Sequence, residues 1–228
     1  MNALGCACVS RRFVLGGFAA LTAAPALGQT PACPTGRPSY IVRKRPLQAA
    51  IDYSLEVADL ARVSQARDGQ FGTRTQHGQR PAGLTVADFK LDWSMTANSL
   101  GTGRQACVAP DRIEVDLRME RHRIYIARDA TRSGTCQRDV VLEHESRHVR
   151  INLEFVEDAK TRIERVLAEQ VPQLGTLTGA PNSALAVFRE RLRRPIETAF
   201  QSALSVASAR HAEMDTREAY QRDWARCA

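Results

Sequence analysis

The chain has 228 residues, of which 43% are hydrophobic and 25% charged, and its net charge is +7. This length fits one domain, or one domain in two lobes, and is sufficient for a sizeable core. The arginines are dispersed among apolar and acidic residues without interleaved aromatic side chains. Such a distribution is typical of solvated faces, and we therefore expect no nucleic-acid partner.

Residues 1–28 have the pattern of an export signal. Arg11 and Arg12 precede an apolar run that ends near Leu27, where small residues follow. A basic start, a short apolar run and a small-residue end are typical of a cleaved signal peptide, and the run is too short to span a membrane. The paired arginines resemble a twin-arginine signal, with an ordinary secretory signal as the alternative. We expect a periplasmic or secreted protein without a membrane span once the signal is removed.

Beyond the signal the chain keeps four cysteines: Cys33, Cys107, Cys136 and Cys227. Four cysteines in an exported chain suggest two disulfides, for which three pairings are possible. Our first expectation is Cys107–Cys136, which would tie a β region to the helix that follows it. Cys33–Cys227 would then join the two ends of the mature chain.

The N-terminal half predicts strands and one short helix. Residues 29–70 form a Pro-rich tether, a strand near residues 40–42 and a helix within residues 52–67, and residues 68–81 predict a mobile loop. Apolar and polar residues then alternate around Phe89 to Trp93, Ile113 to Leu117 and Ile124 to Ile126. This alternation predicts a small antiparallel sheet of three or four strands.

The C-terminal half predicts two long helices. One covers residues 138–171 and ends before Pro172, because Val149, Val156 and Ile163 recur at intervals of seven. The second begins near Asn182 and carries an apolar stripe, with Pro195 expected to kink it. The expected fold class is α+β, in which a small antiparallel sheet precedes a long two-helix hairpin and residues 71–228 form one domain.

Residues 144–148 read His-Glu-Ser-Arg-His. On a helix His144 and His148 share one face and can grip a single metal ion, while Glu145 can reach a metal-bound water as a general base. Zinc would lower the pKa of that water to about 7 and polarise a carbonyl group. The alternative is a solvated helix whose histidines bind nothing, and the charged Arg147 between them favours it.

A catalytic zinc usually has three protein ligands and an open position. No helix break follows His148, so we expect the third ligand from the second long helix. In an antiparallel hairpin this helix returns to the level of the histidines near residue 207, and His211 lies about one turn further on its inward stripe. We predict His211 as the third ligand. Asp215 is the runner-up, either as a ligand or as a partner that orients an imidazole.

Over residues 70–228 the chain resembles a family of predicted secreted bacterial zinc-dependent proteases of the zincin group. The resemblance rests on the strands around Trp93 and Cys107, on the run from Val141 to His148, and on the run from His211 to Gln221. It implies an α+β zincin-like domain in which His144 and His148 bind zinc and Glu145 is the catalytic base.

The expected function is therefore an exported zinc metallopeptidase that acts on a protein or a peptide, including peptides of the cell wall. The alternative is a non-catalytic envelope protein, a disulfide-tied helical module that binds a partner and in which zinc is structural or absent. His77 and His122 are interpreted as ordinary surface or strand histidines.

Overall fold

A computed structural model describes residues 33, 36–65, 81–130 and 135–227, all within the unit Pro31–Ala228. The predicted export signal and residues 68–80 of the predicted loop lie outside these ranges. Among the described residues, no helix combines the length and the apolar character needed to cross a membrane.

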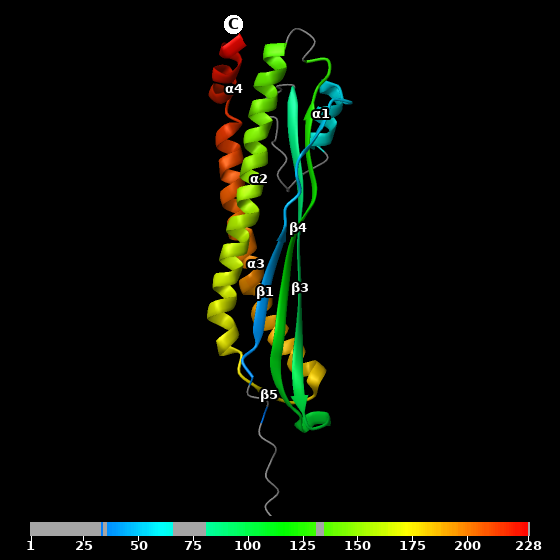
Figure 1. Cartoon of the computed structure of the whole chain (residues 1–228), viewed down its shortest axis with the longest axis vertical. Helices are drawn as coiled ribbons and strands as arrows, with labels where there is room; N and C mark the ends of the chain where they lie inside the picture. The colour runs from blue at the N-terminus through cyan, green and yellow to red at the C-terminus, as the bar shows by residue number, and fades with distance from the viewer. Residues whose placement is uncertain (1–32, 34–35, 66–80, 131–134, 228) are drawn as a thin grey trace, which may run out of the picture. The chain divides into compact units, whose positions relative to one another are not determined.

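The sheet is built on two long strands. β3 (Gly83–Leu100) and β4 (Cys107–Ile126) pair antiparallel along their length, and Figure 1 shows them side by side. Gly101 and Gly103 in their connection have φ values of 90° and 62°, which glycine adopts without steric cost. The helix η2 (Gly103–Gln105) completes this turn. The alternating segments predicted as three or four strands are thus parts of one long hairpin.

Three short strands line the other edge of β4. β1 (Ser39–Arg45) and β2 (Ala50–Asp52) pair parallel to it, and β5 (Leu177–Thr178) pairs antiparallel with its first residues. The sheet is therefore mixed, whereas we expected it to be antiparallel. Alternation of apolar residues indicates which face of a strand is buried but carries no information on the direction of its neighbour.

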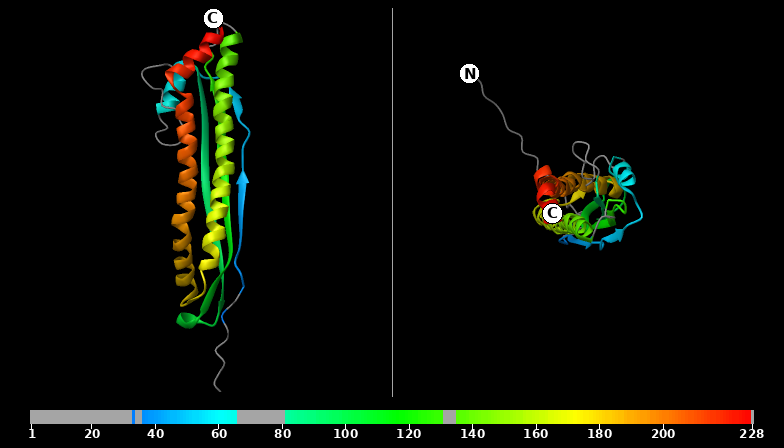
Figure 2. Two further views of the ribbon diagram at one scale, coloured as in Figure 1. Left: turned by 90° about the vertical axis from the view of Figure 1, so that its left-hand side faces the viewer. Right: turned by 90° about the horizontal axis from the view of Figure 1, so that it is seen from above.

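Helices cover both faces of the sheet. α2 (Thr135–Gln170) and α3 (Pro181–Met214) form an antiparallel hairpin alongside the strands in Figures 1 and 2. α1 (Val57–Gln65) packs through Leu60 on Leu84 and Val86, while Thr85 between them contacts α2, so the two helices lie on opposite faces. The predicted α+β class is confirmed.

The main core lies between the sheet and the α2–α3 hairpin. It is filled by fully buried apolar side chains of β4, α2 and α3: Ile113, Val115, Ile163, Leu167, Phe188, Leu192 and Ile196. Each such side chain contributes roughly 1.5–3 kcal/mol by leaving water. α3 begins at Pro181, where a missing N–H costs nothing, and it continues through Pro195 as one helix. This core fixes the register of the two long helices, which carry the residues of the candidate site.

The disulfides are Cys33–Cys107 and Cys136–Cys227, with Cα–Cα distances of 5.4 and 5.8 Å. The expected pairings of Cys107 with Cys136 and of Cys33 with Cys227 are both wrong. β4 has 20 residues and separates its ends by about 60 Å at about 3.3 Å per residue. The ten residues from Ile126 to Cys136 reach at most about 36 Å, so the chain cannot return to Cys107.

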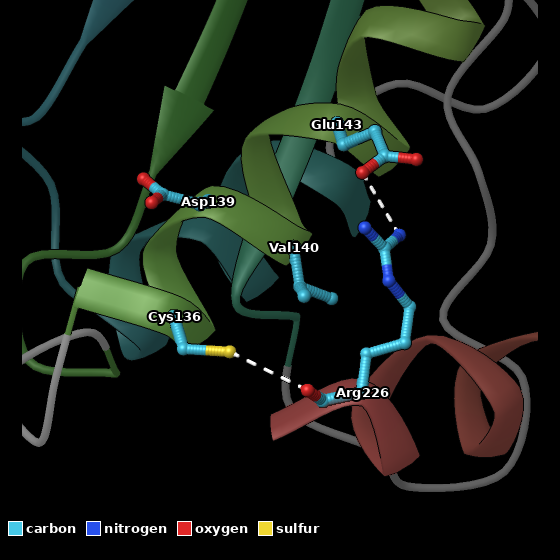
Figure 3. A pocket seen from close by; sticks show the side chains of 5 residues that line it. All are labelled: Cys136, Asp139, Val140, Glu143 and Arg226. Atoms are coloured by element: carbon cyan, nitrogen blue, oxygen red, sulfur yellow. Dashed lines mark hydrogen bonds and ion pairs between the residues drawn. The ribbon is translucent and has the colours of Figure 1, made fainter.

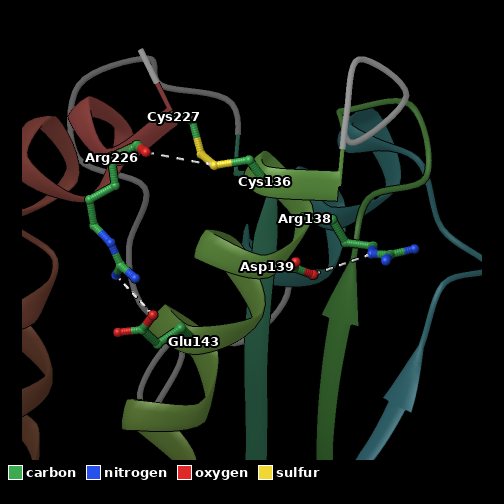
Figure 4. The surroundings of a disulfide bond; sticks show 6 residues. All are labelled: Cys136, Arg138, Asp139, Glu143, Arg226 and Cys227. Carbon is green, nitrogen blue, oxygen red and sulfur yellow. Dashed lines mark hydrogen bonds and ion pairs between the residues drawn. A yellow bond between two sulfur atoms is a disulfide. The ribbon is translucent and has the colours of Figure 1, made fainter.

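The Cys136–Cys227 bond joins the start of α2 to the C-terminal segment (Figure 4). That segment contains α4 (Arg217–Trp224) and η4 (Ala225–Cys227). Figure 3 shows the adjoining pocket, where Arg226 reaches Glu143 of α2 at 2.8 Å. α4 is therefore held against the same helix that carries the His-Glu-Ser-Arg-His motif.

Candidate metal centre

The motif lies within α2, near its N-terminal end, and places two imidazoles one helical turn apart. His144 and His148 are buried, with exposed fractions of 3% and 2%, and their Nε2 atoms are 3.2 Å apart. A fixed helical register produces this pairing, because side chains four residues apart lie on one face. The structure thus brings together the two histidines that the sequence predicts as ligands.

Asp215 completes a triangle of potential ligand atoms. Its Oδ1 lies 3.2 Å from His144 Nε2 and 3.1 Å from His148 Nε2. In a tetrahedral zinc site with bonds of about 2.0–2.1 Å, the ligand atoms would be about 3.3 Å apart. The three atoms therefore have nearly the spacing that a shared ion requires, and this buried group could hold a metal ion.

The chemistry of this triangle also fits a cation. Asp215 Oδ1 accepts a hydrogen bond from the Tyr220 hydroxyl at 2.9 Å, whereas Asp215 Oδ2 is buried without a hydrogen-bond partner among the described residues. A buried carboxylate oxygen without a partner is costly. With both imidazoles unprotonated at Nε2, their lone pairs and those of the carboxylate would converge on one point, where a cation would stabilise all three.

His211, the predicted third ligand, occupies a different position. Its Nδ1 lies 2.6 Å from His148 Nδ1, on the side of that ring that faces away from Asp215, and its Nε2 lies 3.0 Å from Asn152 Oδ1. The runner-up Asp215 takes the place beside the two Nε2 atoms. His211 instead contacts Nδ1 of His148, one of the candidate ligands.

The connection between the long helices explains this difference in level. After η3 (Val171–Gln173) the chain continues to β5, which pairs with the first residues of β4, before α3 begins. α3 therefore starts further from the histidines than a tight hairpin would place it. The chain reaches the level of His144 and His148 at positions 211–215. This is about one to two turns later than residue 207, the position predicted from the sequence.

α4 supplies the surroundings of His144. The His144 Nδ1 lies 3.1 Å from Asp223 Oδ2, and the Tyr220 ring stacks on the imidazole with centroids 4.7 Å apart. Asp223 also pairs with Arg147. The arginine that made the motif look unusual therefore neutralises the carboxylate that orients His144. Sequence reasoning missed Asp223, because its only signal was an acidic residue eight positions after Asp215.

The side chain of Glu145, on α2, lies against β3. The Thr85 hydroxyl donates to Glu145 Oε2 at 2.7 Å, and Glu145 as a whole is 5% exposed. Burial raises the pKa of Glu145, against the opposing charges of His148 and His144. A buried carboxylate that retains a proton more readily than usual is suited to general acid–base chemistry.

The other titratable groups fall into two sets. Burial lowers the pKa of His211 to about 3 and also lowers the pKa of His122, so burial favours the neutral form of both rings. Burial disfavours charge on His144 and Asp215 as well. Their mutual hydrogen bond nevertheless contributes to a raised pKa of His144 and a lowered pKa of Asp215. The centre therefore favours a positive charge next to the Asp215 carboxylate.

Gly83 of β3 permits the close approach of Glu145. A Cβ at this position would lie 2.6 Å from Val141 Cγ1 and 2.7 Å from Glu145 Oε1. We expect Gly83→Ala to lower the free energy of unfolding by about 1–3 kcal/mol, because the strand and helix must separate. Gly179→Ala, whose Cβ meets no atom within 4 Å, should stay within about 0.5 kcal/mol of the wild type. Urea unfolding of both variants measures this, and equal stabilities would contradict the steric argument.

No family model, no curated protein and no solved structure matches this chain. The function is therefore argued from the geometry of the centre.

Proposed function

We propose that the protein is an exported zinc-dependent metallopeptidase in which His144, His148 and Asp215 bind zinc and Glu145 is the general base. The observation that carries this proposal is the convergence of two Nε2 atoms and one carboxylate oxygen within 3.2 Å, next to a buried glutamate. Three protein ligands leave a fourth position for water or substrate, as in catalytic zinc sites. The resemblance of the motif to zincin-type proteases supports the same class.

The residues would divide the reaction between them. Bound zinc would lower the pKa of a water and polarise the scissile carbonyl. Glu145 would accept a proton from the attacking water and later pass it to the leaving amine. Thr85 would hold the carboxylate through its hydroxyl. Asp223 and Tyr220 would keep the ring of His144 in place.

The substrate is a protein or a peptide, including the peptides of the cell wall. The two disulfides support an oxidising compartment, since such bonds persist in the periplasm and outside the cell. A periplasmic or secreted location follows from this and from the signal pattern of residues 1–28.

A second candidate is a non-catalytic module in which the metal is structural. The burial of the centre favours it, because the side chains of the three candidate ligands are only 3–8% exposed. In this alternative the metal ties α2 to the end of α3, and Glu145 would have no chemical role.

The first test is the metal content of the protein, purified without chelators and scanned for all transition metals. We expect about one zinc per chain, and loss of peptide hydrolysis when the zinc is removed. Full activity should return when zinc alone is added back. A protein that takes up no zinc even after addition would contradict the proposal.

A further inference from the structure

We propose that His211, Asn152 and His122 form a buried hydrogen-bond relay that fixes the tautomer and orientation of His148. They are positioning residues, since none of them adjoins the point where the three candidate ligand atoms meet. The inference rests on the proposed function in that His148 is a zinc ligand. It extends the centre along α2 to β4 and to the backbone after β1.

The relay is a continuous series of contacts. From His148 Nδ1 it passes to His211 Nδ1 at 2.6 Å, and from His211 Nε2 to Asn152 Oδ1 at 3.0 Å. Asn152 Nδ2 lies 3.4 Å from His122 Nε2, and His122 Nδ1 lies 2.7 Å from the Leu47 carbonyl oxygen. The four side chains are 1–6% exposed. Each of their polar atoms would therefore be costly to leave without a partner.

The end of the relay sets the direction of every bond in it. The Leu47 carbonyl can only accept, so His122 Nδ1 carries the proton and, in the neutral ring, His122 Nε2 accepts from the Asn152 amide. The Asn152 carbonyl oxygen then accepts from His211 Nε2–H. This leaves His211 Nδ1 as an acceptor for the proton on His148 Nδ1.

The consequence appears at the metal side of His148. With its proton on Nδ1, the ring presents the Nε2 lone pair to Asp215 Oδ1 and to His144 Nε2. The opposite tautomer would point a proton at the place of the ion. A fixed tautomer keeps this proton away from the place of the ion. Hydrogen-bond partners of metal-bound histidines commonly have this effect.

The two ligands are thus oriented in different ways. His144 uses a direct carboxylate, Asp223, at 3.1 Å, whereas His148 uses a neutral series of side chains from three different elements. The relay makes the metal centre depend on Asn152 and His122, which no motif marks in the sequence. Asn152 is 1% exposed, whereas the other buried side chains of α2 that the structure describes beyond His148 are apolar. A polar residue in this part of the core is itself a signal of a role.

The test compares Asn152→Leu with Asn152→Asp in the full-length protein. Two readouts are taken: the zinc Kd by competition with a chromophoric chelator, and the tautomer of His148 by nitrogen NMR of the zinc-free protein. We expect Asn152→Leu to raise the Kd about 10–100-fold and to lower the population of the Nδ1–H tautomer. Asn152→Asp keeps an acceptor for His211 and should retain most of the affinity and of the tautomer.

Ile151→Val is the matched control, because Ile151 is the neighbouring buried residue on α2 and belongs to the apolar core. It should leave both the Kd and the tautomer unchanged. If Asn152→Leu does not fold, His122→Leu takes its place with the same two readouts, since it removes the acceptor for the Asn152 amide. A folded Asn152→Leu or His122→Leu variant with an unchanged Kd or an unchanged tautomer would overturn the inference.

The two proposals fail in different ways. A wild-type protein that binds no zinc would contradict the proposed function, whereas the tautomer of His148 in the zinc-free protein still tests the relay. A wild-type protein that binds zinc while His148 populates both tautomers would contradict the relay alone.

Discussion

Glu145→Gln should retain the zinc of the wild-type protein and lose peptide hydrolysis by about 10²–10⁴-fold, the usual contribution of a general base. Glutamine has nearly the shape of glutamate, and its amide oxygen can still accept the hydrogen bond that Thr85 donates to Glu145 Oε2. It cannot take a proton from water. The measurement is kcat/KM on a mixed peptide substrate, with the zinc content of the same sample determined in parallel.

Glu143→Gln is the matched control, since it makes the same chemical change two residues earlier on α2. Glu143 pairs with Arg226 beside the Cys136–Cys227 bond (Figure 4), and its side chain is 52% exposed, unlike those of the candidate ligands. Its activity should equal that of the wild type. Undiminished hydrolysis by Glu145→Gln would remove Glu145 from the chemistry, and a zinc-containing protein without any hydrolytic activity would favour the structural alternative.

The elements of this fold were predictable where one local pattern decides them. The stripe at Val149, Val156 and Ile163 predicts α2, and Pro172 marks its end to within two residues. The positions of β1, β3 and β4 were predictable in part, whereas β2 and β5 were not predicted and the partner of each strand was not predictable. β1 and β2 lie parallel to β4, and pairing between distant segments depends on the path of the whole chain.

The candidate site divides in the same way. Helical spacing alone places His144, Glu145 and His148 correctly relative to one another. Contacts between elements depend on the length and path of the connections between them. This is why the structure places Asp215, and not the predicted His211, beside the two Nε2 atoms. The contacts of Asp223 with His144 and of Asn152 with His211 could not be identified from the sequence, because they form only when α4 and α3 pack against α2. The disulfide pairing likewise required the length of β4.

Asp215→Ala should weaken zinc binding by more than about 100-fold, beyond the 10–100-fold typical of a residue that only supports a ligand. The variant removes the Asp215 carboxylate, whose Oδ1 lies within 3.2 Å of both Nε2 atoms. His211→Ala should fall within the smaller range, because it removes a partner of His148 Nδ1 and no ligand atom. Zinc Kd values from chelator competition order the two variants.

Glu213→Ala is the control for the loss of charge, because it removes an exposed carboxylate near Asp215. It should bind zinc as the wild type does. The reverse order, with His211→Ala the weaker binder, would restore His211 as the third ligand and require a register of α3 different from the one described.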